Sequence, residues 1–408
     1  MNDLRSLWAA FAIIGLVGGR AAAQLAVTNV SATPRWPWED KVDIGYEIVC
    51  ENPTSEIRVV VGGVDYDRGQ TVSMSSTAGD GTDGLVTAGV KRVTWDAGAD
   101  KGSTFQSASF AARVSAVRGE ALYMIVDLSA GPTATNYPIS FAATLPDPIP
   151  DSYKTTNLVL RYCPPGTYFK GSPTSELGRV DYQEERHEVT LTKPFYIGIF
   201  EVTQKQWQFV MGTNPSLYVG DARPVDWVHY IHIRGSDAGT NFPPQNSVEA
   251  DSFMGRLRIR SNLLFDLPTE AQWEYACRAG TTNALNSGKN LTQASAQCPN
   301  MDEVGRYLYN RADGKGGYTN HTTVGSYLPN NWGLYDMHGN VWEWCLEKTI
   351  DHLGYLPVTD PSGVATGRWY NVGGSYDQTP QWCRSASRGH PDYRGRVGFR
   401  VAYFPEGL

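Results

Sequence analysis

Residues 331–344 read NWGLYDMHGNVWEW, and this stretch decides how the larger part of the chain folds. Within it, Glu343 lies between Trp342 and Trp344 and follows a tight loop that begins at Gly339. A carboxylate among indole rings is costly unless it is paired or ligates a cation. A loop that offers backbone carbonyls beside one carboxylate suits calcium, which prefers oxygen ligands. Glu343 is therefore either a hydrogen-bonded core glutamate or a calcium ligand, and the loop slightly favours calcium.

The sequence around this stretch is rich in tryptophan and glycine and contains few clear helices. A capping box of Thr203 and Gln206 predicts a short helix that ends at Gly212, and a second box beginning at Thr269 predicts a helix that ends at Gly280. The remainder is typical of loops and short strands. A large domain with so little regular structure must be held by aromatic packing, disulfides or bound ions.

Five phrases of this region occur together and in order. They are PGTYFKGS (165–172), GIFEVT (198–203), LPTEAQWEYACR (267–278), the stretch at 331–344, and GGSY (373–376) continuing through CRSASR (383–388) to GFR (398–400). Together they resemble the sulfatase-modifying-factor domain, the fold of the formylglycine-generating enzymes. The resemblance covers residues 157–406. It implies an irregular α+β fold that is related to C-type lectins and stabilised by calcium.

The resemblance also implies a chemistry, that of an oxygen-dependent oxidoreductase. The founding enzymes oxidise a cysteine within a Cys-x-Pro-x-Arg motif of a sulfatase to formylglycine, with O₂ and a copper(I) ion held by two thiolates. Soft thiolates select copper(I). Counting forward from residues 373–376, Cys383 falls at the first copper position, and counting back from Arg388, Ser385 falls at the second. One thiolate is therefore absent, which puts copper in doubt. Cys383 and Ser385 are the catalytic candidates, and a structural role is favoured for Cys383.

By the same resemblance, two loops would hold calcium. In the first, backbone carbonyls and the Glu343 side chain would be the ligands, and the carbonyls are those of His338, Gly339 and Val341. The second would use Asn310 together with the carbonyls of Arg311 and Tyr318. The aspartate that ligates in the family falls at Gly316 here, which leaves this second loop in doubt.

Other candidate sites are weaker. His229 and His232 are spaced like metal ligands on a helix, but no third ligand is near them in sequence, which favours surface or packing roles. Five arginines crowd the C-terminal end, at Arg384, Arg388, Arg394, Arg396 and Arg400. They suit either bidentate binding of a carboxylate or sulfate, or the internal fastening of loops. The internal role is favoured for Arg388 and Arg400.

The N-terminal part of the chain has a different pattern. Between residues 25 and 144, apolar residues alternate with polar ones, as at Val42, Ile44, Tyr46 and Ile48. Short alternating runs bounded by glycine turns predict an all-β sandwich. The proline-rich tract LPDPIPD begins at residue 145, and it predicts a linker over 145–156 that separates the two domains.

The first 23 residues are typical of a secretory signal peptide. Arg5 precedes the apolar run LWAAFAIIGLV at 7–17, and AAA at 21–23 forms a cleavage site. A membrane anchor needs about 20 apolar residues, and Arg20 interrupts this run too early. We therefore expect a secreted or periplasmic protein with no membrane span after cleavage. Six cysteines fit an oxidising compartment.

Two functions remain open at this stage. The mild net charge of −7 and the lack of a basic stripe exclude a nucleic-acid partner. The first function is oxidation of a sulfatase polypeptide by an enzyme with an incomplete copper site. The alternative is a non-catalytic, calcium-stabilised, lectin-like protein that binds another protein or a glycan, or acts as a scaffold.

Overall fold

The computed structural model describes most of the chain. The described residues are 26–35, 39–50, 53, 57–65, 70–74, 76–80, 85–102, 107, 110–118, 122–235, 248–261, 263–311, 320–350, 354–363, 368–389 and 394–404. The predicted signal peptide (1–23) and Tyr318 lie outside them. Within these ranges every helix is too short or too polar to cross a bilayer. The chain divides into two compact units, one of Met1–Leu122 with Pro164–Phe169 and one of Tyr123–Cys163 with Lys170–Leu408.

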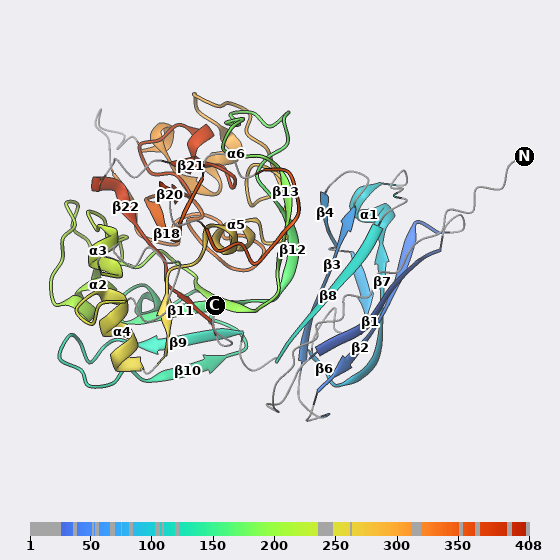
Figure 1. Cartoon of the computed structure of the whole chain (residues 1–408), viewed down its shortest axis with the longest axis horizontal. Coiled ribbons are helices and arrows are strands. Elements are labelled where there is room, and N and C mark those ends of the chain that lie inside the picture. The colour runs from blue at the N-terminus through green and yellow to red at the C-terminus, as the bar shows by residue number, and fades with distance from the viewer. Residues whose placement is uncertain are drawn as a thin grey trace, which may run out of the picture. The chain divides into compact units, whose positions relative to one another are not determined.

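The first unit is a β-sandwich, as predicted (Figure 1). One sheet has the order β1 (Ala26–Pro34), β2 (Lys41–Val49), β7 (Gly89–Asp96), β5 (Thr77–Gly79). The other contains β4 (Gln70–Ser73), β3 (Ile57–Asp65), β6 (Leu85–Val86) and β8 (Phe110–Arg118), and helix α1 (Ala97–Lys101) follows β7. Residues of both sheets, including Ile44, Trp95, Ile57 and Phe110, share one core. The alternation in β2 buries every second side chain, because successive strand residues face opposite sides.

The second unit is built on a six-stranded antiparallel sheet. Its order is β10 (Ile139–Ala142), β9 (Tyr123–Asp127), β11 (Asn157–Cys163), β14 (Phe195–Gly198), β23 (Ala402–Tyr403), β15 (Phe265–Asp266). β9 and β10 correct the predicted boundary, because they precede the proline-rich tract and yet pair with this sheet. Met124 and Val126 of β9 face the larger core, so the tract lies inside the second unit. Alternation in sequence does not reveal which sheet a strand joins.

The remaining elements of the second unit are short. The helices are α2 (Gln204–Met211), α3 (Tyr230–Ile233), α4 (Phe253–Ser261), α5 (Glu270–Arg278) and α6 (Pro299–Asp302). The further strands are β13 (His187–Leu191), β16 (Gly305–Arg306), β17 (His338–Gly339), β18 (Trp342–Thr349), β19 (Val358–Thr359), β20 (Arg368–Val372), β21 (Arg388–Gly389) and β22 (Val397–Gly398). Strand β12 (Gly166–Lys170) belongs to the first unit except for Lys170. Both predicted capping boxes are present, at α2 and α5. The α+β class with few helices is therefore confirmed.

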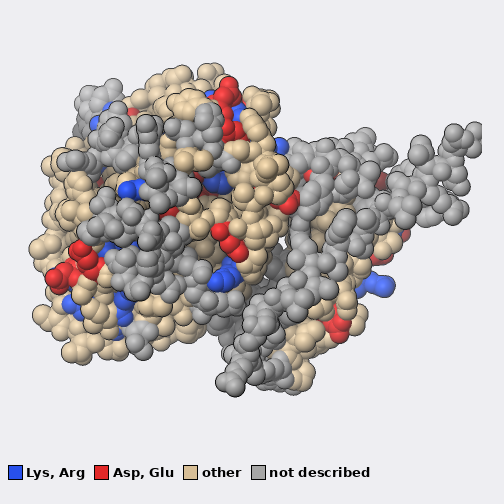
Figure 2. Space-filling view, viewed as in Figure 1, with Lys and Arg blue, Asp and Glu red and all other residues tan. Residues whose placement is uncertain are grey.

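The stretch at 331–344 leads into a four-stranded sheet of order β21-β20-β18-β22. Trp342 and Trp344 of β18 enter the main core of the unit. In that core Trp207 stacks on Phe253, with ring centroids 5.3 Å apart, and Phe253 meets Phe399 edge to face. Aromatic packing thus holds loops and short strands together, as the composition indicated. On the face shown in Figure 2, the described acidic and basic side chains are interspersed.

Candidate functional site

Cys383 lies at the end of a 3₁₀ turn, and its side chain is completely buried. Its Sγ is 3.9 Å from the carbonyl oxygen of Ser375. A Cβ on Gly374 would lie only 2.5 Å from this sulfur, so the glycine is needed for the close approach. The thiol belongs to a small buried cluster that also contains Leu285 and Met301. Burial raises the pKa of the Cys383 thiol, which therefore stays protonated at neutral pH.

Ser385 is also buried, but it has different neighbours. Its Oγ donates to the carbonyl of Ala284 at 3.1 Å and lies 3.6 Å from the Sγ of Cys277. Cys277 comes from helix α5, and burial raises the pKa of its thiol to about 12. The hydroxyl at the second copper position thus touches a cysteine that sequence reasoning passed over. Only the position of Cys277 within a family phrase pointed to it.

His338 holds this buried cluster together through both ring nitrogens. Its Nδ1 lies 2.7 Å from the carbonyl oxygen of Cys383, and its Nε2 lies 2.9 Å from the backbone N–H of Asn286. A carbonyl only accepts and an N–H only donates, so the proton resides on Nδ1. Burial lowers the pKa of His338 to about 4. The imidazole is therefore neutral, and both of its nitrogens are already engaged.

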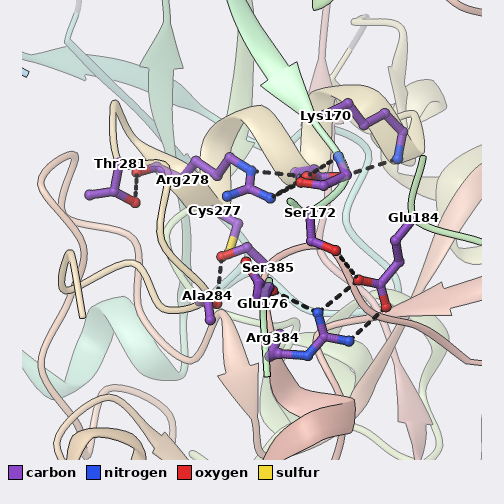
Figure 3. A network of polar contacts seen from close by, with 12 residues as sticks. Lys170, Ser172, Glu176, Glu184, Cys277, Arg278, Thr281, Ala284, Arg384 and Ser385 are labelled. Carbon is purple, nitrogen blue, oxygen red and sulfur yellow. Dashed lines mark hydrogen bonds and ion pairs between the residues drawn. The ribbon is translucent and has the colours of Figure 1, made fainter. Parts of the chain in front are cut away.

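Two buried ionic clusters lie on either side of Ser385 (Figure 3). In the first, Arg384 donates to Glu176 at 2.7 Å and to both carboxylate oxygens of Glu184 at 2.6 and 2.7 Å. The hydroxyl of Ser172 donates to the same Glu184 carboxylate at 2.6 Å. Arg384 is fully buried, so these bonds compensate for the loss of its hydration.

The second cluster is centred on helix α5. Lys170 contacts Glu270 at 2.5 Å and Glu274 at 3.1 Å, and Arg278 pairs with Glu274 at 2.7 Å. Arg388 lies 3.0 Å from Glu270 and also donates to two backbone carbonyls. Arg388 thus links buried segments of the chain to one another, as predicted. The segment that carries Cys383 and Ser385 is therefore held on both sides by buried charges.

Glu343 is the carboxylate on which the calcium prediction depends. Arg400 donates from Nε to Oε2 and from Nη2 to Oε1, each at 2.7 Å, and Trp273 donates to Oε2 at 2.8 Å. Glu343 and Arg400 are both completely buried. This is the core-glutamate arrangement that the sequence left open. A calcium ion would have to share the carboxylate with a guanidinium, so this side chain does not fit the ion.

The second predicted calcium loop has a similar arrangement. The Oδ1 of Asn310 accepts from the backbone N–H of Tyr307 at 2.9 Å, and the Asn310 carbonyl accepts from Arg306 at 2.7 Å. Arg311 follows in the described range, whereas Tyr318 does not. The first loop is close in space, because β16 and β17 pair Arg306 with Gly339. Calcium in either loop stays a prediction.

The residues do not fit copper(I) either. A copper(I) site of the predicted kind needs two soft thiolates, and here it would have one buried thiol and one hydroxyl. Among the described residues, no three His, Cys, Asp or Glu side chains are grouped closely enough to hold a metal. His229 and His232 contact one another edge to face, with ring centroids 5.3 Å apart. All six cysteines are described, and each is an unpaired thiol.

Comparisons with known proteins agree with the fold. Residues 147–404 match the family model described as sulfatase-modifying factor enzyme 1-like domain. The chaperone protein LppX of Paenibacillus barcinonensis is 35% identical over 187 residues, which cover 39% of this chain and 64% of that protein. The formylglycine-generating enzyme of Mus musculus is 34% identical over 143 residues, covering 33% of this chain and 38% of the enzyme.

A mouse protein named as inactive matches at a similar identity. The inactive C-alpha-formylglycine-generating enzyme 2 of Mus musculus is 36% identical over 142 residues, covering 33% of this chain and 38% of that protein. The alignments thus span less than two thirds of these relatives. Among solved structures, Treponema denticola variable protein 1 has a TM-score of 0.47 and 24% identity, covering 61% of this chain and 96% of that one. Since the family model matches more than half of the sequence, the chain belongs to the sulfatase-modifying-factor family of formylglycine-generating-enzyme-like proteins.

Proposed function

We propose that this protein is an exported member of the family that binds a polypeptide partner without oxidising it through a copper–thiolate site. One observation carries the proposal. The two side chains at the copper positions, Cys383 and Ser385, are buried and held by separate structural contacts. Neither is arranged with the other as a ligand pair.

The chemistry of the thiols supports this proposal. Copper(I) selects thiolates, and burial raises the pKa of both Cys383 and Cys277, which disfavours their thiolate forms. The hydroxyl of Ser385 is a hard donor and is already hydrogen-bonded to Ala284. A substrate cysteine would also have to reach sulfur atoms that are enclosed on all sides. Such access would require this segment to move, and the buried hydrogen bonds of Arg384 and Arg388 oppose that movement.

The choice of a polypeptide partner rests on the relatives. The formylglycine-generating enzymes act on sulfatases, and the Paenibacillus relative is named a chaperone protein. Sequence identity does not indicate whether this chain resembles the enzyme or its inactive relative more, since the two mouse proteins are 34% and 36% identical to it. The Cys-x-Pro-x-Arg segment of a sulfatase is therefore the first partner to test. Another protein or a glycan is the alternative.

The experiment combines a binding and a conversion measurement on the mature protein. A fluorescent Cys-x-Pro-x-Arg peptide is titrated by anisotropy, with a Ser-x-Pro-x-Arg peptide as the control that cannot be converted. The same mixtures, with O₂ and copper(I), are followed by mass spectrometry beside the Cys383→Ala variant. We expect saturable binding of both peptides and no conversion.

Two other results would contradict parts of the proposal. Conversion to formylglycine that Cys383→Ala abolishes would show that the oxidase chemistry is present despite the single thiol. Absence of binding by both peptides would rule out the sulfatase segment as partner.

A further inference from the structure

Arg400 is surrounded by oxygen atoms in the way a bound metal ion would be. Its guanidinium donates to both oxygens of Glu343, to the carbonyl of Gly198 at 2.9 Å and to the carbonyl of Tyr335 at 3.1 Å. The side chain is fully buried. One carboxylate and two backbone carbonyls are the donor types that calcium takes in loops of this kind. The cation they surround here is part of the chain.

A second arginine does the same in the neighbouring loop. Arg306 donates from Nη1 to the carbonyl of Asn310 at 2.7 Å and from Nε to the carbonyl of Asn320 at 3.2 Å. Its backbone also supports the first loop, because the carbonyl of Arg306 accepts from the N–H of Asn340 at 2.8 Å. In each of the two loops, a guanidinium therefore donates to an oxygen-bearing group at which calcium is predicted, the Glu343 carboxylate in the first loop and residue Asn310, through its carbonyl, in the second.

Glu201 lies beside the first loop and is also held by groups of the chain. One of its carboxylate oxygens accepts from the side-chain amide of Asn340 at 2.5 Å, and the other accepts from the N–H of Val341 at 3.0 Å. Both oxygens of this buried acid therefore have partners within the protein.

We infer that Arg400 and Arg306 act as built-in cations that replace calcium in these two loops, so that the unit keeps its fold without a divalent metal. Charged hydrogen bonds from a planar guanidinium to a carboxylate are strong and directional. A calcium ion on the Glu343 carboxylate would meet a positive group at 2.7 Å from both oxygens. In a buried site such repulsion is screened little.

The test is thermal unfolding of the mature, full-length protein together with its metal content. Unfolding is followed in excess Ca²⁺ and in excess EDTA, and calcium is quantified by elemental mass spectrometry. We expect the two melting temperatures to agree within about 1 °C and no stoichiometric calcium. A true site saturated about 1,000-fold above its Kd would raise the melting temperature by roughly 10 °C. Such a rise, or one retained calcium per chain, would overturn the inference.

Variants test the role of each arginine directly. Arg306→Gln keeps a hydrogen-bond donor but removes the charge, and we expect a melting temperature several degrees lower. Arg256→Gln is the matched control, because Arg256 donates to the carbonyls of Asp251 and Met211 outside these loops. We expect it to lower the melting temperature less than Arg306→Gln does. Arg400→Gln is the stricter variant, because Arg400 is fully buried. Where Arg400→Gln fails to fold, Arg306→Gln alone decides. A loss of melting temperature in Arg306→Gln that is no larger than the loss in Arg256→Gln would contradict the inference. These readouts do not depend on peptide binding or conversion.

Discussion

Ser385 and Cys277 are 108 positions apart in sequence, yet Oγ and Sγ lie 3.6 Å from one another. This distance is short enough that a sulfur in place of the hydroxyl would need only a small shift to form a disulfide. We therefore expect Ser385→Cys to form a bond with Cys277 under oxidising conditions. A loop of this length corresponds to a stabilisation of at most about 4–5 kcal/mol, since the bond restricts the unfolded chain.

Thiol titration and thermal unfolding check this first prediction. The oxidised variant should lose two reactive thiols relative to its reduced form and unfold at a higher temperature. The control is Ser385→Cys combined with Cys277→Ala, which keeps the new thiol but removes its partner. Equal unfolding temperatures with and without reductant would contradict the prediction.

The buried side chain of Glu347 should make the folding stability depend on pH, which is again a prediction about a single residue. One carboxylate oxygen accepts from the N–H of Glu270 at 2.8 Å, and the other has no hydrogen-bond partner among the described residues. Burial, followed by repulsion from Glu270, raises the pKa of Glu347 to about 8. The folded state therefore keeps a proton that the unfolded chain releases from its ordinary pKa of 4.5 upward. Stability should fall as the pH rises from 4.5 to 8 and then level off.

Glu347→Gln should remove this pH dependence. We expect the variant to be more stable than the parent at pH 9, on the order of a few kcal/mol, and no more stable near pH 4. Denaturant unfolding at several pH values measures the difference. Glu303→Gln is the control, because Glu303 is partly exposed and pairs with Lys289. Parallel pH profiles for the parent and Glu347→Gln would argue against a protonated Glu347.

At the scale of elements, helix α5 depends on its N-terminal cap. Thr269 accepts from the N–H of Gln272 at 3.1 Å, and the Gln272 side chain accepts from the N–H of Thr269 at 2.9 Å. Thr269→Ala should cost about 1 kcal/mol, since one helix N–H loses its partner. Thr269→Ser keeps the hydroxyl and should cost less. Denaturant unfolding of the two variants compares them, and equal losses would mean that packing of the methyl group dominates.

The same elements indicate what the sequence could predict. Capping boxes and glycine stops are local signals, so α2 and α5 were predicted from a few adjacent residues. Contacts that form only in the folded chain left no such signal. Glu343 pairs with Arg400, which is 57 positions away, and the sequence did not indicate this partner. It left Glu343 only as either a hydrogen-bonded core glutamate or a calcium ligand. The contact between Cys277 and Ser385 was not visible at all, because each residue lies in a separate phrase.

At the scale of the whole molecule, the hairpin of β9 and β10 belongs to the second unit. β9 pairs with β11 over five residues, from Asn157 opposite Asp127 to Arg161 opposite Tyr123. Met124, Val126 and Leu128 are completely or almost completely buried in the core of that unit. Removing the hairpin would expose this apolar surface and leave β11 as a sheet edge.

Two fragments test where the structural boundary lies. A fragment of residues 123–408 keeps the hairpin, and we expect it to unfold in a single cooperative transition. A fragment of residues 145–408 begins at the proline-rich tract that the sequence predicted as the linker. Because it lacks β9 and β10, we expect it to aggregate or to unfold at a temperature at least about 10 °C lower, since several buried side chains lose their core contacts. Circular dichroism melting and size-exclusion chromatography measure both properties. Equal melting temperatures for the two fragments would show that the hairpin adds little to the stability of the unit. The proline-rich tract would then mark the N-terminal boundary of the folded unit.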